Sequence, residues 1–412
     1  MLLGGCSSWI SASEFGALSF VLFVVSGTAL TRSLRFEMRQ RRLLTRRIVI
    51  LGCGPMTVKL LEDIEAIEGG LDVVAGVIDD RHLPEPWASR IPWLGVPAQL
   101  GEIVAAVRPA RIVVAVADRR DRLPLQLLLE SRVRGIIVED SMEFYERLTG
   151  KMAIEELKPS ALIHSAGFHN HGAAETTARV VSLVVAAIGL MLSAPLLAVI
   201  AIAIKLDSRG PVLFVQQRAG RNGQPFRLLK FRTMRPCDEP GSEWARDNEH
   251  RITRVGRWLR RFRLDEVPQL VNVLRGEMNL VGPRPHPTSN HEIFSQRIAY
   301  YLLRSTVRPG VTGWAQVRYG YANNLEEETE KMRYDLYYIK NRSLWLDSRI
   351  LLHTVLVVLG GQGAAAVRPE SHHPNLTPSA EYTAKPSPLH LVIRRTWSGR
   401  AAARPQVEAV RR

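Results

Sequence analysis

The sequence predicts an α/β protein with an N-terminal membrane helix, a parallel-sheet domain, and then a mostly helical domain that contains a second apolar helix. Three observations predict this organisation. Residues 15–31 and 180–204 are two uncharged, mostly apolar runs of the length that membrane helices need. Between them, from residue 46 to about 150, short β-branched runs alternate with helical or loop patterns. Such alternation is typical of parallel strands joined by right-handed crossovers.

The first apolar run is expected to cross a membrane once, within a segment that spans residues 1–45. No Lys or Arg precedes the run, whereas seven Arg and a single acid, Glu37, occupy residues 32–47. The positive-inside rule therefore places the N-terminus outside and the chain from Arg32 onward in the cytoplasm. The order of charges is the reverse of that in a secretory signal peptide. A buried core helix is the alternative interpretation.

The overall charge favours a partner that is itself negative. The 412 residues include 55 Lys and Arg against 40 Asp and Glu, which gives a formal net charge of +15. Because no RNA-reading aromatic motif or zinc-finger spacing occurs, we expect no nucleic acid partner and favour anionic lipid or a phosphorylated substrate. The three cysteines are far apart and lack metal-ligand spacing, which is typical of unpaired thiols in a reducing cytosol.

Residues 46–157 form the predicted parallel-sheet domain, which is of the Rossmann-like type. Its expected strands are Arg47–Leu51, Val73–Asp79, Ile112–Ala117 and Gly135–Val138. The first strand leads into Gly52-Cys53-Gly54-Pro55-Met56-Thr57, a partial dinucleotide fingerprint in which Thr57 replaces the third small residue. This pattern leaves two interpretations open: a nucleotide site, or a tight strand-to-helix turn that binds nothing.

A linker, residues 158–178, separates this domain from the second apolar run. It holds His164, His169 and His171, which we interpret as part of a surface or interfacial loop. The apolar run that follows contains Pro195, and both of its flanks are basic. Since neither end looks external, the helix is expected to enter the bilayer, break at Pro195 and return, with Ser193 able to satisfy a freed carbonyl.

Three later stretches are amphipathic: His250–Leu264, Ile293–Leu303 and Leu344–Leu359. Each fits either a helix in the lipid headgroup layer or an ordinary core helix. After them, residues 362–412 are rich in Ala, Pro, Ser and Arg without periodicity. That composition predicts a disordered basic tail.

The stretch from Arg257 to Pro287 carries the candidate chemistry. Adjacent carboxylates, Asp265 and Glu266, follow several arginines and precede a basic turn, residues 282–285. Pro268 fits the first turn of a helix that Gly276 ends, so both acids lie at or before its positive N-terminus and should stay ionised. An ionised Asp can attack phosphorus while its neighbour holds a metal ion or takes a proton. The alternative is a capping Asp beside a solvated Glu.

Several ordered blocks of sequence match one known family. They are residues 205–211 (KLDSRGP), 230–234 (KFRTM), the stretch just described and residues 309–317 (PGVTGWAQV). On these motifs the chain resembles the bacterial sugar transferases, which are monotopic polyprenyl-phosphate hexose-1-phosphate transferases. Within them it resembles the exopolysaccharide subgroup with an N-terminal Rossmann-like domain. The resemblance implies a catalytic domain at residues 179–361 with a re-entrant membrane helix at residues 180–204.

The resemblance also implies a reaction, in which a hexose-1-phosphate passes from a UDP-sugar to polyprenyl phosphate and UMP is released. Asp265 matches the nucleophile that forms a covalent phosphosugar intermediate, and Glu266 matches its partner, which coordinates Mg²⁺ or handles the acceptor phosphate. Three basic residues match phosphate-binding positions: Arg260, Arg284 and Lys230. This reaction would be the first membrane step of exopolysaccharide or related glycan assembly.

The implied location is the cytoplasmic face of the bacterial inner membrane. Besides the two substrates, the expected partners are membrane lipid, downstream glycosyltransferases and a second copy of the chain. Trp314 is available for stacking on the nucleotide or for packing, and both roles remain open. Asp335 and Asp347 are possible helpers outside the main set of site residues.

Two competing hypotheses give the work to the first domain instead. The chain would then be a membrane-tethered nucleotide sensor or an NAD(P)-dependent sugar-modifying oxidoreductase. Both require residues 52–57 to bind a dinucleotide. No residue pattern discriminates between glucose, galactose and an amino sugar as the transferred group.

Overall fold

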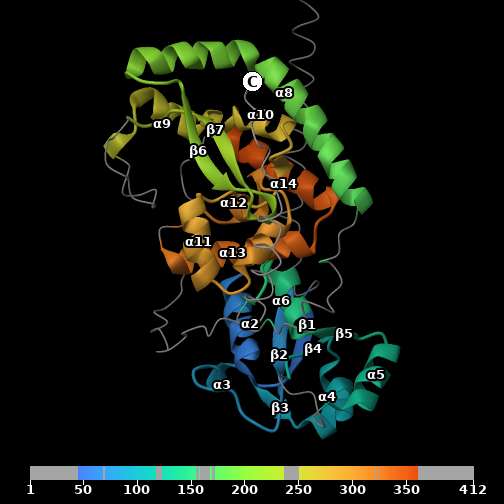
Figure 1. Cartoon of the computed structure of the whole chain (residues 1–412). Helices are drawn as coiled ribbons and strands as arrows, with labels where there is room; N and C mark the ends of the chain where they lie inside the picture. Colours follow the sequence, from blue (N-terminus) through green and yellow to red (C-terminus); the bar gives the residue numbers. More distant parts are fainter. Residues whose placement is uncertain are drawn as a thin grey trace, which may run out of the picture. The chain divides into compact units, whose positions relative to one another are not determined.

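The structure is a computed structural model that describes residues 45–67, 70–116, 123–154, 157, 168, 172–235, 250–320, 322 and 324–360. The chain forms two compact units, which divide between Thr149 and Gly150 (Figure 1). The predicted N-terminal membrane helix, the three linker histidines and the predicted tail lie outside the described residues.

The first unit is built on a five-stranded sheet of order β3-β2-β1-β4-β5, and all of its strand pairs are parallel. The strands are β1 (Arg46–Leu51), β2 (Asp72–Ile78), β3 (Trp93–Gly95), β4 (Arg111–Val114) and β5 (Ile137–Asp140). The predicted parallel sheet is therefore confirmed, and β3 is a strand that the sequence pattern did not indicate. Residues 48–51 of β1 are fully buried, as expected for a central parallel strand that is covered on both faces.

Five helices connect and cover these strands: α2 (Pro55–Ala66), α3 (Trp87–Arg90), α4 (Leu100–Val107), α5 (Leu125–Val133) and α6 (Ser141–Thr149). A short 3₁₀ turn, η1 (Pro97–Gln99), leads into α4. The main core cluster joins β1, β2 and β4 to α4 through side chains such as Leu51, Ile78 and Leu100. Helices that alternate with parallel strands are what the alternating sequence pattern predicts.

The turn between β1 and α2 binds its own neighbouring acid. The backbone N–H of Cys53 donates to Oδ2 of Asp79 at 2.5 Å, and the N–H of Arg81 donates to Oδ1 at 3.2 Å. Gly52 has a φ of 116° and a Cβ there would lie 2.8 Å from the Ala115 backbone, so the turn requires glycine. The carboxylate at the end of β2, where a dinucleotide site would place a ribose-binding acid, is thus engaged by loop amides.

The second unit is mostly helical. Its helices are α8 (Gly172–Asp207), α9 (Arg254–Arg261), α10 (Gln269–Leu274), α11 (Thr288–Arg297), α12 (Trp314–Arg318), α13 (Leu325–Lys340) and α14 (Leu344–Leu359). The described residues of this unit also form three 3₁₀ turns: η3 (Arg221–Gly223) between β6 and β7, η5 (Leu264–Glu266) between α9 and α10, and η6 (Tyr301–Thr306) between α11 and β9. The strands are an antiparallel hairpin of β6 (Leu213–Ala219) and β7 (Pro225–Phe231), and a parallel pair of β8 (Asn279–Val281) and β9 (Gly310–Thr312).

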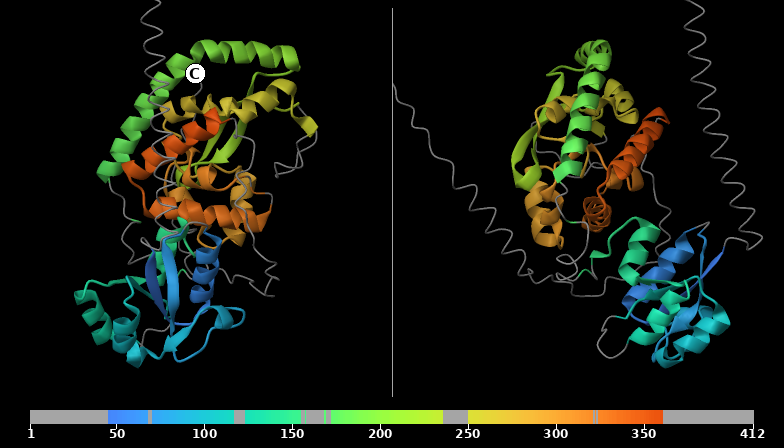
Figure 2. Two further views of the ribbon diagram at one scale, coloured as in Figure 1. Left: turned by 180° about the vertical axis from the view of Figure 1, so that it is seen from behind. Right: turned by 90° about the vertical axis from the view of Figure 1, so that its right-hand side faces the viewer.

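Helix α8 consists of two arms joined at a bend (Figures 1 and 2). Pro195 lies inside the helix and removes one backbone donor, which is the usual cause of such a kink. The Ser193 hydroxyl donates to the carbonyl of Leu190 at 3.3 Å. By length and composition, residues 175–207 are also the one helix in the described part of the chain that could cross a membrane.

Each arm of α8 packs on a different part of the unit. The first arm contributes Ala186 to a cluster with Phe226 of β7 and Val273 of α10. The second arm contributes Ile200 and Ile204 to a cluster with Phe231 and Leu259. Most other large apolar side chains of α8 are exposed, for example Met191 (69%), Leu192 (70%) and Val199 (62%). An exposed apolar surface of this extent on one helix is typical of contact with lipid or another protein.

Hydrogen bonds fix the first arm to the segment between α10 and β8. Arg179 donates to the carbonyls of Met278 at 2.7 Å and Val273 at 2.6 Å. One turn later, Ser182 accepts from the N–H of Leu280 at 3.2 Å. The first arm of α8 is therefore attached at the start of the strand that leads toward Arg284.

Candidate active site

The acid pair lies on η5, a single 3₁₀ turn between α9 and α10. Arg263, just before it, has a left-handed backbone with φ 51°, which separates this turn from α9. Pro268 caps α10, and Gly276, with φ 87°, follows its last residues. These are the helix start and end that the sequence predicts, so the two carboxylates do lie just before a helix N-terminus.

Glu266 is held by two arginines. Its Oε1 accepts from Nη2 of Arg284 at 2.8 Å, and its Oε2 lies 3.4 Å from Nη1 of Arg263. Burial by itself would raise the pKa of this carboxyl, but the two guanidiniums outweigh burial and lower the pKa to about 2. Glu266 is therefore ionised throughout the physiological range.

Asp265 is in a different state although it is the adjacent residue. It is buried, at 8% exposure, and neither of its oxygens accepts a hydrogen bond or ion pair from any residue that the structure describes. Burial, and then the charge of Glu266, raise the pKa of Asp265 to about 6, against the opposing charges of Lys230, Arg260 and Arg284. Most molecules therefore carry an ionised but unpaired Asp265 at neutral pH. Adjacent residues with separated pKa values can take separate roles.

The five residues selected from the sequence therefore share one electrostatic environment. Lys230 comes from β7, Arg260 from α9, and Arg284 from the turn after β8. All three act on the charge of Asp265. A concentration of cations around two carboxylates is suited to binding a phosphorylated anion.

Lys230 faces this cluster from the hairpin. Its Nζ lies 4.9 Å from the ring centroid of Phe214, across the β6–β7 pair. Burial, and then the neighbouring charges of Arg218 and Arg284, lower the pKa of Lys230 to about 8. Lys230 forms no ion pair with any residue in the described ranges. It is thus a cation close to an ionised acid but without a bound counterion.

Asn272 sets the distance between the hairpin and the acid pair. This fully buried side chain on α10 accepts from the N–H of Leu229 at 3.0 Å and donates to the carbonyl of Arg227 at 2.7 Å. It therefore fixes β7, which carries Lys230, against the helix that follows Asp265. This role could not be predicted from the sequence, because an Asn within a short helix is not distinctive.

A buried network beneath the basic turn was also not predicted. Arg304 donates to Asp335 at 2.6 Å, to the carbonyl of Arg284 at 2.5 Å, and to Nδ1 of His286 at 2.9 Å. His286 in turn lies 3.1 Å from Glu328 through Nε2, and burial lowers the pKa of His286 to about 3. The imidazole is therefore neutral and donates from Nε2 to Glu328. Asp335 thus has a supporting role through Arg304.

Trp314 takes the packing role of the two that the sequence left open. It is 2% exposed, and its indole N–H donates to the carbonyl of Gly150 at 2.9 Å. The ring of Tyr337 stacks on it with centroids 6.0 Å apart, and the guanidinium of Arg318 lies 4.5 Å from its ring. The indole faces are covered by protein, so we do not assign Trp314 to nucleotide stacking.

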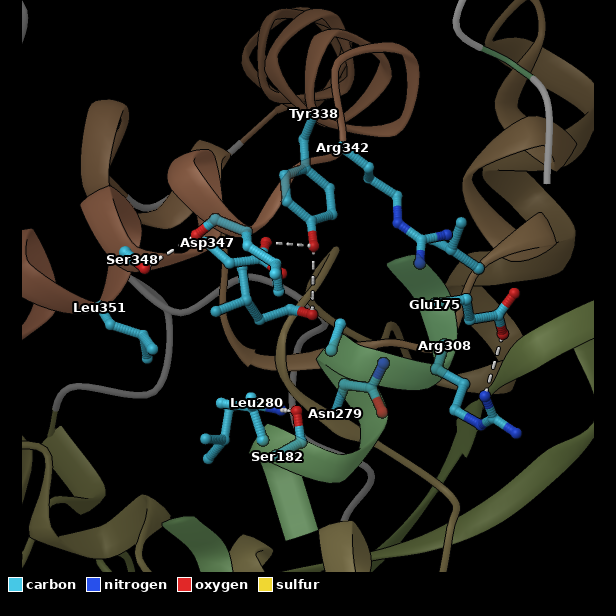
Figure 3. Close-up of a pocket in the computed structure, with 15 residues that line it drawn as sticks. Glu175, Ser182, Asn279, Leu280, Arg308, Tyr338, Arg342, Asp347, Ser348 and Leu351 are labelled. Atoms are coloured by element: carbon cyan, nitrogen blue, oxygen red, sulfur yellow. Dashed lines mark hydrogen bonds and ion pairs between the residues drawn. The ribbon is translucent and has the colours of Figure 1, made fainter. Parts of the chain in front are cut away.

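A cavity of about 200 Å³ lies between the first arm of α8, β8 and the start of α14 (Figure 3). Tyr338 donates to Asp347 at 2.8 Å at one side of this cavity, and Arg308 pairs with Glu175 at 3.1 Å at the other. None of the five selected residues lines it. The charged cluster around Asp265 is therefore separate from this cavity, and Asp347 belongs to the cavity.

The residues of the cluster could hold a magnesium ion only in a mode that uses few protein ligands. Within the described ranges no group of three or more His, Cys, Asp or Glu converges on a point. Glu266 offers carboxylate oxygens that already accept from arginines, and Asp265 offers free ones. Mg²⁺ commonly binds through one or two carboxylates together with substrate phosphates and water. The donor set present agrees with that mode.

Most of the described part of the second unit matches one known protein family. Residues 173–361 match the model of the family described as bacterial sugar transferase. The glucose-1-phosphate transferase of Caulobacter vibrioides that uses UDP-glucose and undecaprenyl phosphate is 49% identical over 181 residues, which cover 43% of this chain and 67% of the relative. The chain belongs to the bacterial sugar transferase family.

Other bacterial sugar transferases extend the similarity. UDP-N-acetylgalactosamine-undecaprenyl-phosphate N-acetylgalactosaminephosphotransferase of Aeromonas hydrophila is 44% identical over 187 residues, 45% of this chain and 44% of the relative. UDP-glucose:undecaprenyl-phosphate glucose-1-phosphate transferase of Escherichia coli K12 is 34% identical over 288 residues, 68% of this chain and 61% of the relative. The chain thus spans about half of the Aeromonas protein. According to their names these relatives transfer different sugars, so the similarity does not identify the sugar that this chain would transfer.

Proposed function

We propose that this sugar transferase moves a hexose-1-phosphate from a UDP-sugar to polyprenyl phosphate and releases UMP. The observation that carries the proposal is the contrast within the acid pair: Asp265 is ionised without a partner, while Glu266 is held by Arg284 and Arg263. A free carboxylate among cations is available to attack phosphorus, whereas a doubly paired one is not. The relatives named above act on undecaprenyl phosphate and UDP-sugars, according to their names.

The proposed reaction has two displacements at phosphorus. In the first, a carboxylate oxygen of Asp265 bonds to the β-phosphorus of the donor, the bond from that phosphorus to the bridging oxygen breaks, and UMP leaves with the electron pair. In the second, an oxygen of polyprenyl phosphate bonds to the same phosphorus and Asp265 leaves. The product is a polyprenyl diphosphate sugar, and the Asp265 carboxylate is restored. Each displacement joins two anions, so local cations are needed.

The chain's own residues supply those cations. Arg284 reaches Glu266 at 2.8 Å and can extend its guanidinium fork to a phosphate oxygen. Lys230 and Arg260 already act on the charge of Asp265 and would lower the repulsion between this carboxylate and the incoming diphosphate. When bound, Mg²⁺ would be held by the acid pair and the diphosphate and would offset further negative charge.

The membrane supplies the acceptor. We propose that α8 enters the cytoplasmic leaflet of the inner membrane, turns at Pro195 and returns, because its large apolar side chains are exposed and the helix is bent. The active-site cluster contacts this helix through α9 and α10. Such a placement would bring a lipid-borne phosphate and a soluble nucleotide sugar to one site. It would serve exopolysaccharide or related glycan assembly, with downstream glycosyltransferases as consumers of the product.

The test is release of UMP from UDP-sugars by the detergent-solubilised protein with polyprenyl phosphate and Mg²⁺. Asp265→Asn should abolish release, while Asp347→Asn at the separate cavity should retain it. With a donor labelled at the β-phosphate and no acceptor, label should attach to the peptide that contains Asp265 and leave when acceptor is added. An active Asp265→Asn protein would eliminate the proposal. If the protein is active but never becomes labelled, the sugar phosphate is transferred directly to the acceptor and not through a covalent intermediate.

A further inference from the structure

The turn that carries Arg284 has too few backbone N–H groups to be stabilised by hydrogen bonds within itself. Residues 283–287 alternate three prolines with Arg284 and His286, and proline has no N–H. The carbonyls of four successive residues, 283–286, nevertheless all accept hydrogen bonds from elsewhere. The donors are Gly310 N–H to Pro283 (3.0 Å), Arg304 to Arg284 (2.5 Å), Arg218 to Pro285 (2.9 Å) and Ala219 N–H to His286 (2.9 Å).

Two of these four donors are guanidinium groups that meet adjacent carbonyls. Arg304 reaches the Arg284 carbonyl from η6, and Arg218 reaches the Pro285 carbonyl from β6. The Arg284–Pro285 and Pro285–His286 peptide units are thus each held by a guanidinium from a different element. The Arg284 side chain leaves from this fixed backbone and reaches Glu266 at 2.8 Å.

Arg218 is difficult to explain by stability alone. Its second contact is the side-chain oxygen of Gln216 at 2.7 Å, and it forms no ion pair within the described part of the chain. Its Nε is buried without a hydrogen-bond partner. Burial, and then the like charge of Arg284, lower the pKa of Arg218 to about 9. A guanidinium that is largely buried without forming an ion pair destabilises the fold, so stability does not account for Arg218.

Arg304, in contrast, is fully neutralised. Asp335 accepts from its Nε at 2.6 Å, and both side chains are almost completely buried. A rigid ion pair of this kind can aim the remaining donors of a guanidinium in fixed directions. One of those donors goes to the Arg284 carbonyl.

We propose that Arg218 and Arg304 are positioning residues for sugar-phosphate transfer. By holding the Arg284 and Pro285 carbonyls, they fix Arg284 where it bridges Glu266 and the donor phosphate. This role rests on the proposed function, and it predicts that both residues act through Arg284 and not on the substrate directly. A misplacement near 1 Å in such a group can reduce a rate by about 100-fold.

A double-mutant cycle tests whether the effect passes through Arg284. Arg218→Lys should reduce kcat/KM for the UDP-sugar by about 100-fold in the wild-type background. In an Arg284→Ala background the same change should reduce it less than about threefold, because the group being positioned is gone. Arg304→Lys should behave alike. Arg308→Lys is the matched control, since Arg308 also donates to a carbonyl, that of Gly276, away from this turn.

Hydrogen exchange gives a second result that does not depend on activity. Exchange at the Gly310 and Ala219 amides, which donate to the Pro283 and His286 carbonyls of the turn, should accelerate in Arg218→Lys and stay unchanged in Arg308→Lys, with the rest of the chain unaffected. Equal losses of kcat/KM in both backgrounds, or unchanged exchange in the turn, would overturn the proposal. If Arg304→Lys is unfolded, Arg304 is needed for the stability of the fold. The proposal is then judged on the results for Arg218→Lys. If the wild-type protein releases no UMP, the proposed function is wrong. The exchange result still tests whether Arg218 and Arg304 fix the turn.

Discussion

Nη2 of Arg284 lies 2.8 Å from Oε1 of Glu266, and this contact joins the turn after β8 to the acid pair on η5. It leaves Asp265, one residue earlier, without a partner among the described residues. The pair is therefore asymmetric: one carboxylate is locked by arginine, and the other is free.

Replacement of Arg284 should impair the enzyme more than its loss of charge suggests. Arg284→Ala removes both the partner of Glu266 and a phosphate contact, and we expect kcat to fall by about 100- to 1000-fold. Arg284→Lys keeps the charge but not the fork, so it should recover only a small part. Arg275→Ala, an exposed arginine at the end of α10, serves as the control. Steady-state kinetics that show equal activity for both alanine variants would contradict this.

The pH profile of kcat/KM should be bell-shaped. Activity should fall below about pH 6, because Asp265, with a pKa of about 6, becomes protonated and is no longer a nucleophile. Activity should fall again above about pH 8, as Lys230 loses its proton. Lys230→Arg should move the alkaline limb to higher pH and leave the acid limb in place. If both limbs of the profile move together in Lys230→Arg, the ionisation of Lys230 does not set the alkaline limb.

The two acids should affect stability with opposite sign. The pKa of Asp265 is raised from 3.8 to about 6, so wild type loses stability relative to Asp265→Asn as pH rises through that interval, by up to about 3 kcal/mol. The pKa of Glu266 is lowered from 4.5 to about 2, so its contribution is present above pH 4.5 and is lost as pH falls toward 2. At pH 7, melting experiments should show Asp265→Asn more stable, and Glu266→Gln less stable, than wild type. The reverse order would mean that the carboxylates are misassigned.

Both ends of α8 should be reachable from one side of the membrane. In a chain whose native cysteines are replaced by serine, Thr177→Cys and Ser208→Cys flank the apolar part of the bent helix. A membrane-impermeant thiol reagent applied to inverted vesicles should label both, and in intact spheroplasts neither. Labelling of one position from each side would show that the helix crosses the bilayer.

Trp314 should matter for stability and not for donor binding. Trp314→Phe loses the hydrogen bond to Gly150 and part of the packing, so thermal stability should fall by about 1–3 kcal/mol. Its KM for the UDP-sugar should stay within about twofold, because the indole is 2% exposed. A large rise in KM with unchanged stability would restore the nucleotide-stacking interpretation.

Features that depend on local pattern could be predicted from the amino-acid sequence. The period of strands and helices predicted the parallel sheet, Pro268 and Gly276 predicted the limits of α10, and Pro195 predicted the break in α8. The ordered motifs identified the family. Each of these follows from backbone geometry or residue order within a short window.

The contacts that side chains make between different elements became visible only in the folded structure. It separated the states of Asp265 and Glu266, buried Trp314, and brought Arg218 and Arg304 to adjacent carbonyls of one turn. The carbonyls of residues 283–286 need donors from other segments, because the alternating prolines have no N–H. The sequence does not show which distant residues supply those donors. Burial and pairing set these states, and both arise only when remote segments pack together.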